Sequence, residues 1–453
     1  MPNDNAGSIV TALEADVAAA APGDRLPSVR ALMARHRAGP ATVQRAIAAL
    51  AARGLVEAKP GKGTFVTARP AAAAATASAP DLSWQTLALG ARAIDADALE
   101  TLLRPPAPGT YVLSAGYLPA ELQPTTPLAA ALTRAARRPG AWDRVPLEGI
   151  HGLRTHFAAA VNADPGDVLI CPGGQAALAA CLRGLTAPGS PVIVETPTYL
   201  GALAAARAQG LEPVPVPADA HGIRPDLLEE ALARSGAQLV YLQPLLANPH
   251  GATLAAERRR PVLEAVRAAG AFLIEDDAFR DLAFDPPPAS LFEQDPDGRV
   301  VQLRSLTKPA APGLRIGALI ARGPALARLR AARIVEDLYV SGPLQEAALE
   351  LVGSSAWRTH LRRVRRVLRE RRDALAAAWG ERVSLPGGGL NLWVRVPSDD
   401  RELALRAAAA GVIVSPGHPF FVAEPPGRFL RLTFAAEPPD RLAQAVARLR
   451  AIM

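Results

Sequence analysis

The segment RSLTKPAAPGLRIG (304–317) contains Lys308, one of only three lysines among the 50 Lys and Arg residues of the chain. Arginine stays protonated, whereas a lysine amine with a depressed pKa can attack an aldehyde and form a Schiff base. Ser305 and Arg315 flank Lys308, and a hydroxyl beside a guanidinium fork suits a phosphate. The segment therefore predicts covalent chemistry between Lys308 and a phosphorylated aldehyde, the plain alternative being a surface lysine.

Three further motifs offer groups for such a ligand. In CPGGQAALAACLRGL (171–185) a glycine turn opens a helix, so the backbone N–H groups of Gly173, Gly174 and Gln175 offer an anion site. Tyr199 in ETPTY could stack on a flat ring, and Asp276 in IEDDAF could pair with a pyridinium nitrogen. Taken singly, the Gly-Gly pair is equally compatible with a plain turn, and Tyr199 is more typical of a core or surface tyrosine. An exposed acidic turn is the alternative for Asp276.

The apolar runs around these motifs indicate the element that positions them. VLICPGG, PVIVETP, AQLVYLQP, AFLIEDD, VVQLRSL and IGALIA are rich in Val, Ile and Leu, and helix-length stretches separate most of them. That pattern is typical of a mostly parallel, doubly wound sheet, whose ligands bind at the carboxyl ends of the strands. Arginine-rich helices over 355–379 and strands at 391–396, 412–415 and 429–434 predict a second, smaller α/β domain.

In this order, the motifs resemble the fold type I enzymes that use pyridoxal 5′-phosphate (PLP), the aspartate aminotransferase superfamily, over about residues 110–440. SxTKxxxPGLRxG is the most specific element. The resemblance implies that Lys308 forms the internal aldimine, that Tyr199 stacks on the ring and that Asp276 pairs with the pyridine nitrogen. By the same resemblance, the phosphate is bound by Ser305, Arg315 and the Gly173–Gln175 turn. Asn248 in NPHG approaches the phenolic oxygen of the ring, and Arg431 in FLRLTFA binds the carboxylate of an amino acid.

Residues 1–67 predict a separate DNA-binding module. A helix is expected over 8–20, a second one capped by Ser28, and a third from Pro40 or Ala41 to Arg53, followed by two short strands around a Pro-Gly-Lys-Gly tip. This is a winged helix-turn-helix, whose third helix can enter the major groove while the wing contacts phosphates. Residues 1–69 carry nine Lys and Arg against five Asp and Glu, which also suits a polyanion.

LPSxRxLxxx followed by TVxxAxxxLxxxGLVxxxPGxGTFV resembles the DNA-binding domain of the GntR family of bacterial regulators. The resemblance implies double-stranded operator DNA as a partner. The residues implied to contact it are Arg30, Thr42, Gln44, Arg45 and, in the wing, Lys59, Lys62 and Gly63. A protein-binding winged helix with ordinary surface residues is the alternative.

The combination of a GntR-type domain, a linker and an aminotransferase-like domain resembles the MocR subfamily, in which the large domain senses ligands and the chains form head-to-tail dimers. The expected domains are 1–67, a linker at 68–81, a large domain at 82–322 and a small domain at 323–453. The resemblance implies a regulator that holds PLP as an aldimine and senses PLP or an amino compound. A working aminotransferase with an appended DNA-binding domain, and a regulator that has lost PLP and binds another ligand, remain alternatives.

Two positions depart from the catalytic superfamily. Where Phe279 stands, the family usually has a Tyr whose hydroxyl contacts the cofactor's phenolic oxygen. Arg144 in RVPLEG stands where a Tyr commonly reaches the phosphate across the dimer. Both changes count against an efficient transaminase more than against a cofactor-binding sensor.

The bulk composition excludes several classes. Charges or prolines interrupt every apolar run before the roughly 18–20 residues of a membrane span, and the N-terminus lacks the features of a signal peptide, so a soluble cytoplasmic protein is expected. Cys171 and Cys181 read as buried free thiols. The seven histidines show no metal-ligand spacing, and His250 and His418 are the two nearest the motifs.

Overall fold

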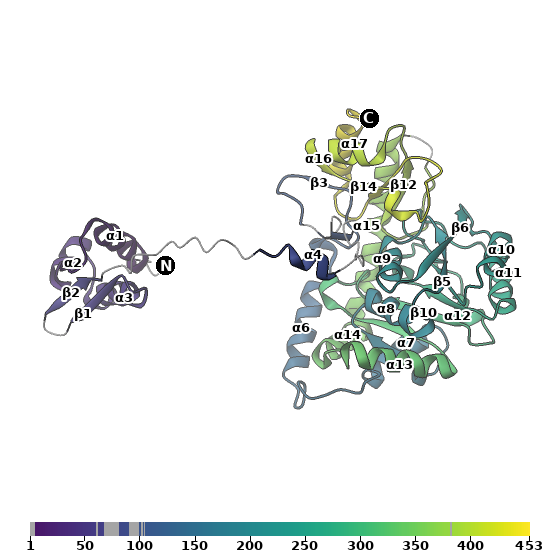
Figure 1. The fold of residues 1–453 in the computed structure, drawn as a ribbon, viewed down its shortest axis with the longest axis horizontal. Coiled ribbons are helices and arrows are strands. Elements are labelled where there is room, and N and C mark those ends of the chain that lie inside the picture. The colour runs from purple at the N-terminus through teal and green to yellow at the C-terminus, as the bar shows by residue number, and fades with distance from the viewer. Residues whose placement is uncertain are drawn as a thin grey trace. The chain divides into compact units, whose positions relative to one another are not determined.

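The computed structural model describes residues 5–59, 62–67, 81–89, 99–100, 103, 105–380 and 383–453 (Figure 1). Its contacts divide the chain into two compact units, Met1–Arg92 and Ala93–Met453. Of the linker predicted at 68–81, only the last residue lies within the described residues.

The first unit is a winged helix-turn-helix, as predicted. Its elements are α1 (Asn5–Ala19), α2 (Val29–His36), α3 (Pro40–Ala52) and an antiparallel hairpin of β1 (Val56–Lys59) and β2 (Gly63–Val66), and a short helix α4 (Trp84–Leu89) follows.

Local sequence fixes the helix ends of this unit, and apolar side chains hold it together. Ser28 Oγ accepts a hydrogen bond from the Ala31 N–H at 3.2 Å and caps α2, while α3 begins at a proline, where the missing N–H costs nothing. Leu13, Leu32 and Leu50 are fully buried between the three helices.

The second unit is built on an eight-stranded sheet in the order β4-β11-β10-β9-β8-β5-β6-β7. The strands from β10 to β6 run parallel, and β11 and β7 are antiparallel to their neighbours. Their bounds are β4 (Val168–Cys171), β5 (Pro191–Thr196), β6 (Glu212–Asp219), β7 (Gly222–Ile223), β8 (Leu239–Leu242), β9 (Phe272–Asp276), β10 (Val300–Ser305) and β11 (Gly317–Ile320).

Helices cover both faces of this sheet (Figure 1), as the apolar runs predict. Successive residues of β5 show the two faces: Val192 and Val194 pack with α8 and α9, whereas Ile193 packs with α7, α10 and α11. The bounds are α6 (Thr125–Ala136), α7 (His151–Ala159), α8 (Gly174–Leu185), α9 (Leu200–Ala208), α10 (Pro225–Ser235), α11 (Ala256–Ala268), α12 (Leu291–Gln294), α13 (Gly323–Asp337) and α14 (Gly342–Gly353).

The smaller α/β region lies beside this sheet and has its own core. An antiparallel sheet of β12 (Asn391–Arg395), β15 (Phe429–Thr433) and β14 (Ser415–Pro416) packs with α15 (Ser355–Trp379), α16 (Asp400–Ala409) and α17 (Pro439–Arg450). A separate pair joins β13 (Val412–Ile413) to β3 (Tyr111–Val112).

The packing moves the domain boundaries predicted at 82 and 323. Tyr111, Leu113 and Leu122 belong to the small core, because β3 pairs with β13. In the other direction, Leu329 of α13 and Leu351 of α14 pack in the large cores. The change of composition at residue 323 therefore does not mark the boundary between the two cores. The chain passes from the core of the large sheet to the core of the small region within α15.

Strand β6 has an unusual composition, because EPVPVPAD contains three prolines. Pro213, Pro215 and Pro217 alternate, so the missing N–H groups all lie on one side of the strand. β6 pairs in parallel with β5 from Glu212 to Pro217, whereas only Ala218 and Asp219 pair with the two residues of β7. The prolines are tolerated because they lie on the largely unpaired edge.

Candidate functional site

Lys308 follows the carboxyl end of β10, and its side chain points into a cavity lined in part by Tyr117, Tyr199, Asp276 and Phe279. Nζ donates a hydrogen bond to the carbonyl oxygen of Gly116 at 2.8 Å and lies 4.3 Å from the centre of the Tyr117 ring.

Burial, and then the nearby charge of Arg431, lower the pKa of Lys308 from 10.5 to about 8, against the opposing effect of Asp276. A lysine at the end of a buried strand can therefore supply an uncharged, nucleophilic amine near neutral pH.

Asp276, at the end of the neighbouring strand β9, is held by groups from β8 and the segment after it. Its Oδ2 accepts hydrogen bonds from Tyr241 Oη at 2.7 Å and Gln243 Nε2 at 3.2 Å. The Oε1 atom of Gln243 accepts in turn from the Asn248 N–H at 3.0 Å. Burial raises the pKa of Asp276, and the hydrogen bond from Tyr241 opposes that rise. The fixed carboxylate has the character needed to pair with a buried pyridinium nitrogen.

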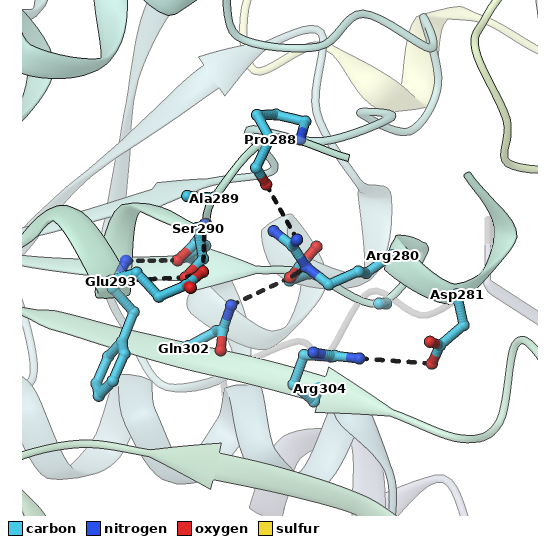
Figure 2. A network of polar contacts seen from close by, with 12 residues as sticks. Arg280, Asp281, Pro288, Ala289, Ser290, Glu293, Gln302 and Arg304 are labelled. Carbon is cyan, nitrogen blue, oxygen red and sulfur yellow. Dashed lines mark hydrogen bonds and ion pairs between the residues drawn. The ribbon is translucent and has the colours of Figure 1, made fainter. Parts of the chain in front are cut away.

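A polar network between β10 and the segment after β9 anchors the residues that follow Asp276 (Figure 2). Asp277, fully buried, forms an ion pair with Arg280 and accepts a hydrogen bond from Gln302 Nε2 at 3.1 Å. Arg280 Nη1 also donates to the carbonyl oxygen of Pro288 at 3.0 Å. The residue after Asp276 is thereby fixed on the far side of the strand, which leaves Asp276 facing the cavity.

The predicted phosphate-binding groups meet at one end of this cavity. Gly173 has φ +94°, and a Cβ there would lie 2.6 Å from Arg315 Nη2, so the close approach requires glycine. Gly173 donates its own N–H to the Cys171 carbonyl, so the first N–H groups of α8, at Gly174 and Gln175, are those left for an anion. Ser305, Arg315 and both α8 residues line the cavity.

Tyr199, Phe279 and Asn248 also line this cavity. Tyr199 Oη donates to Gln175 Oε1 at 3.1 Å, which connects the ring to the start of α8. Asn248 Oδ1 accepts a hydrogen bond from Arg431 Nη1 at 3.3 Å.

Arg431 is a buried cation that no carboxylate neutralises among the described residues. Its Nη2 donates to the Ser114 carbonyl at 2.6 Å, while its buried Nε has no hydrogen-bond partner in the described part of the chain. Burial lowers the pKa of Arg431 to about 10, which still leaves it protonated at neutral pH. Such a guanidinium is suited to receive the carboxylate of a ligand.

The residues predicted to contact DNA lie on the surface of the first unit. Arg30, Gln44 and Arg45 are exposed, Thr42 is half-buried, and Lys62 is exposed beside Gly63 in the wing. Gly63 has φ +115°, and a Cβ there would lie 2.5 Å from Nε of Arg25, a residue that the sequence reasoning missed. Lys59 pairs with Glu57 at 3.6 Å.

The comparisons with known proteins cover both units. The family model "Aminotransferase class I and II" matches residues 113–449, and "Bacterial regulatory proteins, gntR family" matches residues 5–66. The chain belongs to the class I and II aminotransferase family. It is 34% identical over 384 residues to a 2-aminoadipate transaminase of Thermus thermophilus, covering 81% of this chain and 96% of that protein.

Full-length similarity extends this to regulators with both domains. The HTH-type transcriptional regulator TauR of Rhodobacter capsulatus is 30% identical over 463 aligned positions, covering 94% of this chain and 92% of that protein. The predicted MocR-type architecture of the GntR regulators is thereby confirmed.

A crystal structure of the Thermus thermophilus aminotransferase LysN, complexed with N-(5′-phosphopyridoxyl)-L-leucine, matches with a TM-score of 0.76 at 33% identity. It covers 82% of this chain and 98% of that one. Family membership confirms PLP as the predicted cofactor, and the residues around Lys308 fit it, because an amine, a carboxylate and an anion cradle line one cavity.

Within this MocR-type chain, the two departures from the enzymes differ in position. Phe279 lies in the cavity, 5.7 Å from Lys308 Nζ, and brings no hydroxyl to it. Tyr117, which the sequence reasoning missed, lines the same cavity. Arg144 is exposed and does not line the cavity of its own chain.

The remaining sequence predictions concern the cysteines, metal binding and membrane spans. Cys171 and Cys181 are buried free thiols, and burial raises the pKa of Cys171 to about 11. Across the described part of the chain, no group of three His, Cys, Asp or Glu side chains could bind a metal ion. No helix among the described residues combines the length and apolar character needed to span a membrane.

Proposed function

We propose that this protein is a cytoplasmic, ligand-responsive transcription regulator that binds operator DNA through its winged helix and holds PLP at Lys308. The observation that carries the proposal is the occurrence, in one chain, of an exposed reading helix and of a buried lysine amine whose pKa is lowered to about 8.

The residues of the cavity have distinct roles toward PLP, which supplies a reactive aldehyde and an electron-withdrawing ring. Lys308 Nζ would attach the cofactor, and Asp276 would keep its pyridine nitrogen protonated. Ser305, Arg315 and the start of α8 would hold its phosphate, and Tyr199 would contact the ring. Only one of these roles requires a lysine, and Lys308 is the one lysine in the sequence after Lys62.

Arg431 would define the class of effector. Its unneutralised guanidinium is bonded to Asn248, which lines the cavity, so an amino compound with a carboxylate could be held at both ends. PLP itself remains the second possible effector. Either one controls DNA binding only if it has different affinities for two arrangements of the protein.

A homodimer is part of the proposal. Trp142 and Leu338 are 77% and 59% exposed, large apolar groups that a monomer would leave in water. The 141–145 segment packs against the start of α14, since a Cβ on Gly342 would lie 2.8 Å from Val145. Arg144 is exposed on the same segment, where a partner's phosphate site could receive it.

A working aminotransferase is the second candidate function, favoured by the complete set of Lys308, Asp276 and Arg431 in one unit. Phe279 counts against it, because the ring lacks the hydroxyl that would control the cofactor's electronics.

The two functions can be separated with the full-length protein loaded with PLP. Selection from a random pool of duplex DNA should enrich one sequence, and PLP or members of a panel of amino acids should change the affinity for it. Absence of enrichment, or affinity indifferent to all of these compounds, would count against the regulator. Sustained, keto-acid-dependent consumption of an amino acid would establish the enzyme instead.

A further inference from the structure

A second cavity, of about 580 Å³, lies between strand β6 of the large sheet and the sheet of the small region. Within the described residues, it shares no lining residue with the cofactor cavity. The lining residues used below come from the end of β5, β6, the NPHG turn, β12, β15 and the segment after the short 3-10 helix His418–Phe420. They are Thr196, Pro197, Pro215, Pro217, Ala218, Asp219, His250, Trp393, Phe421, Ala423, Glu424 and Phe429.

Aromatic rings form one wall of this cavity. Trp393 and Phe429 stack with their centres 5.0 Å apart and their planes 12° apart, and Phe421 lies 6.0 Å from Phe429. Pro215 and Pro217 line the cavity from the large sheet. A volume of this size between flat apolar surfaces suits one ring or a branched alkyl group.

The charged groups of the lining are negative, since it contains no Lys or Arg among the described residues. Both carboxylate oxygens of Asp219 are held by Arg258 at 2.8 Å, which neutralises it. Glu424 is exposed and has no ion-pair partner in the described part of the chain. His250 stays uncharged, because burial lowers its pKa to about 4. A free carboxylate and electron-rich ring faces both favour a cation.

Three short segments connect the second cavity to the cofactor cavity. Thr196 and Pro197 line the second cavity, while Tyr199 lines the first. In the same way, His250 and Asn248 belong to different cavities although only one residue separates them.

The third connection runs through the Phe420–Phe421 pair. Phe421 lines the second cavity, and the ring of Phe420 lies 5.2 Å from the Arg431 guanidinium. The Phe420 carbonyl also accepts a hydrogen bond from the Thr198 N–H at 2.8 Å, which ties this pair to the segment that carries Tyr199.

We propose that this second cavity binds a small amphiphilic ammonium compound, with its apolar group against Trp393, Phe421 and Phe429 and its cation beside Glu424, and that binding there changes the affinity of the cofactor cavity for PLP. The binding step stands independently of the regulatory role proposed above. Only the coupling step rests on PLP at Lys308.

Benzyltrimethylammonium is a suitable probe, because it has no N–H group and cannot form a Schiff base with PLP. Titration calorimetry of the full-length protein should give saturable binding, with weaker binding of benzyl alcohol, tetramethylammonium and phenylacetate at matched salt. Glu424→Gln should weaken the probe up to about fivefold, as for an exposed ion pair. Glu229→Gln, an exposed glutamate outside the cavity, should leave the affinity unchanged.

Filling variants test the location. Ala218→Phe places a ring in the cavity, and Ala423→Phe does so from an exposed segment, where the risk of misfolding is smaller. Either folded variant should abolish probe binding. Undiminished binding in both, or phenylacetate binding as tightly as the probe, would overturn the site.

Coupling is measured as the dissociation constant of PLP with and without saturating probe. We expect at least a threefold change in the native protein and none in Ala423→Phe. An unchanged constant in the native protein would overturn the coupling alone, whereas failure of PLP to bind at all would count against the cofactor assignment and leave the probe result standing.

Discussion

The cofactor cavity and the DNA-reading face differ in how their polar side chains are satisfied. In the cavity, Asp276, Gln243 and Asn248 bond to one another, and Arg431 joins them. On the reading face, Arg30, Gln44 and Arg45 are exposed and have no hydrogen-bond or ion-pair partner among the described residues.

This difference has a physical reason. Buried polar groups must be paired within the protein, so the fold positions them before any ligand arrives. Exposed groups are paired by water until a polyanion displaces it, and their contribution depends on salt. Substitutions in the cavity should therefore change specific steps and the local structure, whereas those on the face should change affinity without changing the fold.

The largest effect is expected from Lys308→Ala, which removes the amine that attaches PLP. After incubation with PLP, reduction with borohydride and gel filtration, mass spectrometry should detect the cofactor on the native chain and none on the variant. Lys308→Arg keeps the positive charge and should also fail, because a guanidinium does not lose its proton. Covalent label retained by either variant would mean that another amine is the site.

The pH dependence of attachment should separate Lys308 from the two exposed lysines. The deprotonated amine reacts, so the initial rate should rise about tenfold per pH unit and level off above a pKa near 8. For an ordinary lysine the rise would continue to about 10.5. The initial rate of absorbance change from pH 6 to 10 checks this, and a midpoint above 10 would contradict the lowered pKa.

Arg431→Gln should weaken an amino acid ligand by about 10- to 100-fold, since a charge-assisted hydrogen bond contributes roughly 1.5–3 kcal/mol. L-leucine and 3-methylbutylamine form a matched probe pair that differs in the carboxylate alone. The PLP-loaded native protein should prefer leucine, and the variant should lose that preference while its affinity for the amine stays the same. Equal losses for both probes would indicate a structural role, because Arg431 also bonds to the Ser114 carbonyl.

Much of both regions could be predicted from the sequence, because the decisive residues lie in contiguous motifs. Lys308, Ser305 and Arg315 occur within twelve positions of one another, and the strand that ends at Asp276 and the strand that precedes Lys308 both begin with apolar residues and are almost wholly buried.

What the sequence could not reveal depends on chain segments that meet only in the folded state. Tyr117 reaches the cavity from a segment far from the other motifs, and Gln243 acts by bridging two of them. Arg25 lies against the wing because its backbone pairs with Phe65. The boundary between the cores was misplaced for the same reason, because β3 crosses to the small region to pair with β13.

Arg45→Ala tests the reading face and should weaken binding to the selected DNA by about 1–3 kcal/mol if the side chain contacts a base. Arg358→Ala removes one charge from an exposed position of the second unit and serves as the matched control. Affinities are compared at fixed salt by fluorescence anisotropy with selected and scrambled duplexes. A variant that loses affinity equally for both duplexes would place Arg45 on a phosphate, and unchanged affinity would remove it from the interface.

The smallest effect is expected from Phe279→Tyr, which restores the hydroxyl found at this position in the enzymes. The ring lines the cofactor cavity, and its centre lies 5.7 Å from Lys308 Nζ. A hydrogen bond donated toward the cofactor's phenolic oxygen stabilises negative charge there and makes the attached nitrogen easier to deprotonate. The pH midpoint of the visible absorbance of the PLP-loaded protein should therefore fall, by about one unit for roughly 1.4 kcal/mol of differential interaction. An unchanged midpoint would mean that Tyr117, which lines the same cavity, already supplies the donor that Phe279 lacks.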